Sequence, residues 1–142
     1  MTTEKQNAHR VVLDTNVFIS AIFWRGSPHK IVEMALNGRI KVMTSVDILA
    51  ELQEVMKNKF NASDEFIQDQ LNAIMTYAEL TSPNKKVRAV NADPDDNKIL
   101  ECALSSNADF IVSGDSHLTT LNEYNGIEIL SPKEFCEFIN KN

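Results

Sequence analysis

Cysteine and histidine are both scarce in this chain, which has 142 residues but only 2 Cys and 3 His. Cys102 and Cys136 each lie in an apolar, helix-like stretch, so we expect two core side chains and neither a disulfide framework nor a metal clip. No two of the histidines have the spacing of a zinc site. The composition therefore argues against a disulfide-rich protein and against a zinc protein.

Long apolar runs are also missing. None approaches the roughly 20 residues of a membrane span, and the N-terminal MTTEKQNAHR has no hydrophobic signal region. We therefore expect a cytoplasmic protein without a membrane partner. A hydrophobic content of 43% is normal for one globular core. The predicted organisation is a polar N-terminal arm at 1–9 and a single domain at 10–142.

Basic residues are outnumbered by acidic ones, and the formal net charge is −6. This balance argues weakly against a protein that wraps nucleic acid through its overall field, since such proteins have a basic surface. It does not exclude a nuclease, because acidic residues gathered at one metal site lower the net charge while lysines and arginines elsewhere still contact phosphates.

The pattern of apolar residues predicts strands that alternate with helices. The chain has only 4 Gly and 4 Pro, and most of them stand between these segments. Strands are expected at 10–13, 40–44, 87–90, 109–112 and 127–130, and helices at 17–24, 27–37, 45–56, 63–80, 93–107 and from 131. This order predicts a three-layer α/β/α sandwich with a mainly parallel central sheet of about five strands.

Two carboxylates follow predicted strands directly. Asp14 comes after the first strand, and Asp115 follows the fourth within Ser113-Gly114-Asp115. Ligands of open α/β sheets bind beyond the carboxyl ends of the strands, so both acids are expected at that edge. Each also has a structural explanation, as the cap of the helix or turn that comes next.

Helical spacing singles out two further acids. Asp96 lies within the apolar arc of its helix, whereas Asp93 and Asp95 suit capping and the helix dipole. In the helix after residue 45, Glu51 lies about 40° from the apolar stripe and Glu54 about 100° from it. Glu51 is thus expected at the rim of the same edge, and Glu54 in solvent.

Carboxylates that share one edge repel each other and raise each other's pKa values unless a cation lies between them. Oxygen ligands favour Mg²⁺ or Mn²⁺ over zinc. The sequence therefore predicts a site for one or two such ions, with four catalytic and metal-binding residues: Asp14, Glu51, Asp96 and Asp115.

With these residues the chain resembles a PIN-domain ribonuclease of the VapC group, the toxin component of toxin–antitoxin pairs. The resemblance spans 10–138 and rests on four segments: VVLDTNVFISA at 11–21, TSVDILAELQEVM at 44–56, DPDDNKILECAL at 93–104 and ADFIVSGDSHL at 108–118. It implies a PIN-like fold and makes the four acids the metal site. Asn16 and Ser113 are then supporting polar groups, although each also suits a helix cap or a loop.

The same resemblance implies metal-dependent hydrolysis of RNA phosphodiester bonds, a small antitoxin protein as partner and a homodimer. A haloacid-dehalogenase-type phosphatase also has an Asp after its first strand, but it needs a second acid two residues later, where this chain has Asn16. A third hypothesis is a catalytically silent PIN-fold module that binds RNA or protein. The four acids argue against it, and a metal titration with a generic RNA separates the two.

Overall fold

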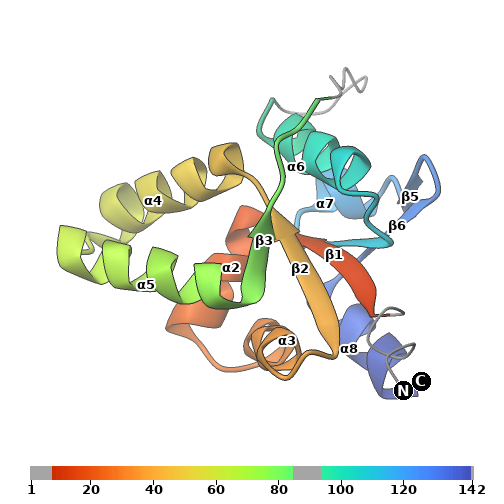
Figure 1. Ribbon diagram of the computed structural model, residues 1–142, viewed down its shortest axis with the longest axis horizontal. Helices are drawn as coiled ribbons and strands as arrows, with labels where there is room; N and C mark the ends of the chain where they lie inside the picture. Colours follow the sequence, from red (N-terminus) through yellow and green to blue (C-terminus); the bar gives the residue numbers. More distant parts are fainter. Residues whose placement is uncertain (1–7, 85–93, 142) are drawn as a thin grey trace.

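The computed structural model describes residues 8–84 and 94–141 (Figure 1). Its elements are β1 (His9–Leu13), α2 (Thr15–Phe23), α3 (Ser27–Leu36), β2 (Ile40–Thr44), α4 (Val46–Phe60), α5 (Asp64–Tyr77), β3 (Ala78–Leu80), α6 (Pro94–Ser105), β4 (Phe110–Val112), α7 (Ser116–Thr119), β5 (Glu123–Tyr124), β6 (Ile127–Leu130) and α8 (Pro132–Lys141). Within this part of the chain, no helix is both long and apolar enough to cross a membrane.

The strands form one sheet in the order β3-β2-β1-β4-β6-β5. Every neighbouring pair is parallel except β5 and β6. Helices flank this sheet: in Figure 1, α6 and α7 lie above the strands, α3 and α8 lie below them, and α4 and α5 extend together to the left. The predicted α/β class with a mainly parallel central sheet is confirmed.

The core forms around the central strand β1. Val11, Val12 and Leu13 are fully buried, because β1 lies between β2 and β4 and is covered on both faces. Helix α6 packs against β1, β2 and β4, while α3 packs against β2 and α8. The buried apolar side chains of all these elements belong to one cluster. A rigid, apolar sheet thus supports whatever polar groups stand at its edges.

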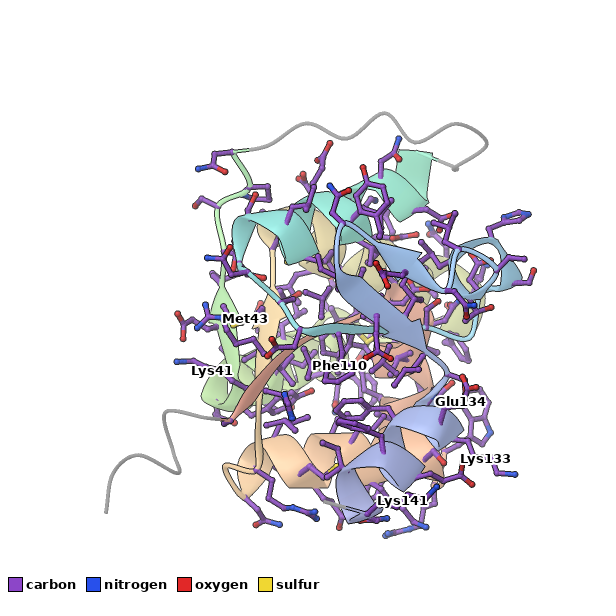
Figure 2. All side chains as sticks on the ribbon, turned by 90° about the vertical axis from the view of Figure 1, so that its right-hand side faces the viewer. Lys41, Met43, Phe110, Lys133, Glu134 and Lys141 are labelled. Carbon is purple, nitrogen blue, oxygen red and sulfur yellow. The ribbon has the colours of Figure 1, made fainter. Side chains whose placement is uncertain are left out.

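Side-chain caps fix where several of the helices begin. The Ser45 hydroxyl accepts a hydrogen bond from the Ile48 N–H and starts α4, as predicted. Before α8, Ser131 and Glu134 cap each other: the Ser131 N–H donates to the glutamate and the Glu134 N–H donates to the serine hydroxyl. Figure 2 shows Glu134 on α8, while Phe110 of β4 lies deeper in the molecule.

Two features of the sheet differ from prediction. Residues 78–80 form strand β3, where the helix from 63 was expected to continue, and β5 was not predicted. The described chain therefore has six strands instead of about five. The strand predicted at 87–90 and the cap predicted at Asp93 lie outside the described residues.

Both cysteines are buried and free, as expected of core residues. Burial raises the pKa of Cys102 to about 12, so its thiol stays protonated at neutral pH. Burial also raises the pKa of Cys136, whose Sγ lies 3.6 Å from the carbonyl oxygen of Ser27.

Candidate metal site

Asp14 lies at the carboxyl end of β1, beside Ser113. The β1–β4 register pairs Leu13 with Val112, and the Asp14 N–H donates to the Val112 carbonyl at 3.0 Å, so the following residues of both strands meet. The Ser113 hydroxyl donates to Asp14 Oδ2 at 2.7 Å. Asp14 occupies the N-cap position of α2 without a side-chain cap hydrogen bond. Capping therefore does not explain this buried carboxylate.

The surroundings of Asp14 disfavour its negative charge. Burial raises its pKa, because the carboxylate is only 8% exposed and has lost most of its hydration. The hydrogen bond from Ser113 opposes this effect, whereas the charges of Asp115 and Glu51 raise the pKa further. Asp115 and Glu51 thus both lie within electrostatic reach of Asp14.

Asp96 and Asp115 meet across the same edge, together with His117. One ligand atom from each of these three side chains lies within 4.8 Å of the other two. Asp96 comes from the first turn of α6 and is buried, as its place in the apolar arc predicts. Asp115 does cap α7, because its Oδ1 accepts a hydrogen bond from the His117 N–H at 2.8 Å. It is therefore both a cap and a member of the cluster.

Glu51 lies near the second turn of α4 and is held by two neighbours. The Thr15 hydroxyl donates to its Oε1 at 2.9 Å, and Lys98 Nζ lies 3.4 Å from the same oxygen. Glu51 and Lys98 are each about one-fifth exposed, so their ion pair is partly shielded from water. Glu54, by contrast, is exposed, as its helical position predicts.

The two supporting residues have different surroundings. Ser113 is fully buried and links two acids, since its Oγ donates to Asp14 and accepts a hydrogen bond from the Asp115 N–H at 2.9 Å. Asn16 is exposed in the first turn of α2. Lys98 and His117 were not predicted as site residues, although each stands two residues after a predicted acid.

Together these side chains form an acidic site, with the positive charge of Lys98 beside Glu51. Its donors are carboxylate oxygens with one adjacent imidazole, a set that suits a divalent cation. Burial is the main cause of the raised pKa of Asp14, and the charges of Asp115 and Glu51 add to it. A cation between the acids would remove this repulsion. The residues present therefore fit Mg²⁺ or Mn²⁺.

Variants of Asp115 separate its capping role from its charge. Asparagine caps helices about as well as aspartate, so Asp115→Asn is expected to be at least as stable as the unmodified protein. Asp115→Ala removes the cap of α7 and is expected to lose about 1 kcal/mol of unfolding free energy. Urea unfolding in the presence of EDTA measures both values, and equal stability of the two variants would argue against the capping role.

Several solved structures share this α/β fold. The chain superposes on VapBC-1 from nontypeable Haemophilus influenzae with a TM-score of 0.60 at 17% identity, covering 87% of this chain and 98% of the other. For VapBC2 from Rickettsia felis, solved with a promoter DNA fragment, the TM-score is 0.59 at 19% identity, with coverage of 84% and 96%. The Trypanosoma brucei RRP44 PIN domain gives 0.54 at 13% identity, with coverage of 95% and 83%.

The sequence agrees with this assignment. A sequence model of the PIN domain matches residues 10–117, and the chain belongs to the PIN domain family. It is also 32% identical, over 93% of its length and 92% of the relative's, to the uncharacterized protein MJ1680 of Methanocaldococcus jannaschii. PIN domains are generally nucleases.

Proposed function

We propose that this protein is a Mg²⁺- or Mn²⁺-dependent endoribonuclease that hydrolyses RNA phosphodiester bonds. The observation that carries the proposal is the approach of Asp96 and Asp115 at one sheet edge, beside the buried Asp14. Burial raises the pKa of Asp14, and the charges of Asp115 and Glu51 raise it further. A purely structural edge has no reason to gather such costly groups. Membership of the PIN family supports the same conclusion.

The side chains divide the work of the site. Asp14, Asp96 and Asp115 are proposed to hold the cation, with Ser113 fixing the Asp14 carboxylate through its hydroxyl. When bound, the ion lowers the pKa of a water molecule and stabilises negative charge on the phosphate. Glu51 completes the acidic rim, and Lys98 beside it supplies a positive charge that can contact a phosphate oxygen.

The proposal extends to a toxin role within a type II toxin–antitoxin pair. Two of the structures with this fold are VapBC assemblies, and they cover most of this chain. We propose accordingly that a small antitoxin protein binds this chain, that the chain forms a homodimer, and that it acts in the cytoplasm. A small open reading frame beside the gene is the first place to look for the antitoxin.

Cleavage of a labelled single-stranded RNA tests the nuclease proposal. We expect fragments with 5′-phosphate and 3′-hydroxyl ends when Mg²⁺ or Mn²⁺ is present, and none in EDTA. A DNA of the same sequence serves as the matched substrate. RNA binding without cleavage at millimolar metal would instead support the silent binding module, and release of phosphate from small monoesters would support a phosphatase.

Co-expression tests the toxin proposal separately. Purifying this protein together with the product of a neighbouring small open reading frame is expected to yield a stable complex without ribonuclease activity. Activity that returns when the small protein is removed by proteolysis supports the antitoxin assignment. An active protein that binds no such product would leave the nuclease proposal standing and overturn the toxin role.

A further inference from the structure

His117 lies beside the candidate metal site but is not one of its four predicted acids. It belongs to the first turn of α7, and its imidazole has a ligand nitrogen within 4.8 Å of carboxylate oxygens of Asp96 and Asp115. Among the described residues this trio brings together two carboxylates and an imidazole that come from α6 and from the start of α7.

Both the backbone and the imidazole of His117 approach Asp115. Its N–H donates to Asp115 Oδ1 at 2.8 Å, which fixes the start of α7, and its Nδ1 lies 3.8 Å from the same oxygen. The imidazole is 68% exposed, so it can rotate without disturbing core packing. Ligands on opposite sides of one ion at about 2.1 Å are roughly 4.2 Å apart. A small rotation of the His117 side chain would therefore bring the three ligand atoms to bonding distance of a single cation.

We propose that His117 is a metal ligand and that its nitrogen makes the site favour Mn²⁺ over Mg²⁺. This inference rests on the proposed metal site. Imidazole suits first-row transition ions, whereas Mg²⁺ prefers oxygen ligands and keeps its water shell. With carboxylates alone the site has no chemical reason to discriminate strongly between these two ions, but a nitrogen ligand provides one.

The competing explanation is a surface ion pair between His117 and Asp115. Such a pair contributes little to stability and has no preference among metals. The chain offers a matched example of that arrangement: His29 Nε2 lies 3.9 Å from Glu33 Oε2 on α3, with no place in the trio. The same nitrogen also lies 3.5 Å from Arg25 Nη1. His29→Ala therefore controls for removing a histidine that faces an acid outside the trio.

Mn²⁺ binding to the full-length protein, free of RNA, tests the proposal. We expect His117→Ala to weaken Mn²⁺ binding by at least about tenfold, as loss of even an outer-shell partner does, and to change Mg²⁺ binding much less. His29→Ala should change neither affinity. Titration followed by the electron paramagnetic resonance signal of free Mn²⁺, with Mg²⁺ as competitor, measures both affinities.

A spectroscopic measurement reports the ligand itself. Electron spin-echo envelope modulation of bound Mn²⁺ should show coupling to one nitrogen-14 nucleus that is present in His29→Ala and absent in His117→Ala. Equal Mn²⁺ and Mg²⁺ losses in His117→Ala, or no nitrogen coupling in the unmodified protein, would overturn the proposal. Nitrogen coupling without RNA cleavage would keep His117 as a ligand while removing the nuclease function, so the two failures are distinguishable.

Discussion

Replacing Asp14 or Asp96 by asparagine lowers metal-dependent RNA cleavage by at least about hundredfold, the upper range for loss of a supporting group at a metal site. Both side chains are buried at the sheet edge, and asparagine keeps their size while removing the charge that attracts a cation. The fold should persist, because Asp14 makes no side-chain cap to α2. Initial cleavage rates at fixed Mn²⁺, with circular dichroism to verify folding, provide the measurement.

Two glutamates of α4 give the matched control for this prediction. Glu51→Gln removes a charge held by Thr15 and Lys98 at the site, whereas Glu54→Gln removes one from the exposed face of the same helix. We expect the first to impair cleavage and the second to leave it unchanged. Full activity in a carefully purified Asp14→Asn/Asp96→Asn double variant would refute the assignment of these acids.

The effect of Asp14→Asn on stability should depend on whether metal is present. Without metal the variant should be more stable than the unmodified protein, and with Mn²⁺ it should be less stable. In EDTA at pH 7 we expect Asp14→Asn to unfold a few degrees above the unmodified protein, because burial and the Asp115 and Glu51 charges disfavour the Asp14 carboxylate. Mn²⁺ at about a hundred times its Kd should stabilise the unmodified protein by roughly 2.7 kcal/mol. The variant should gain much less, so the order of their melting temperatures reverses.

The pH dependence of this difference follows from the raised pKa of Asp14. A carboxyl group with a higher pKa in the folded state destabilises the fold when ionised, and this cost disappears below its unfolded pKa, where both states are protonated. In EDTA the stability advantage of Asp14→Asn should therefore shrink as the pH falls towards 4, near the usual pKa of aspartate. Calorimetric scans between neutral and acidic pH measure it. An advantage that grows at acidic pH would contradict the assigned cause.

The longer helices and strands of this fold were predictable because their apolar residues recur with one period over several positions. The strand at 40–44 and the helix capped by Ser45 have several residues that agree on one period, and the structure confirms both. Strands β3 and β5 have three and two residues, too few to show a period. Residues 78–80 simply continue an apolar helical pattern, and only pairing with β2 makes them a strand.

The site residues that could be predicted are those that the order of the strands alone places at the sheet edge. Asp14 and Asp115 follow neighbouring parallel strands, so the sheet brings them together whatever their side chains do. The parts that depend on side-chain direction across separate helices were not predictable. Lys98 reaches Glu51 from α6 to α4, and His117 turns toward Asp96, and no local spacing encodes either contact.

A crystal of the full-length protein soaked in Mn²⁺ decides whether these acids share a cation. We predict an anomalous peak between the carboxylates of Asp14, Asp96 and Asp115, within bonding distance of their oxygens. The same peak should vanish from Asp14→Asn/Asp96→Asn crystals soaked in parallel. Soaks at millimolar Mn²⁺ that leave no anomalous density at this edge, with the carboxylates ordered, would contradict the metal site and the nuclease proposal built on it.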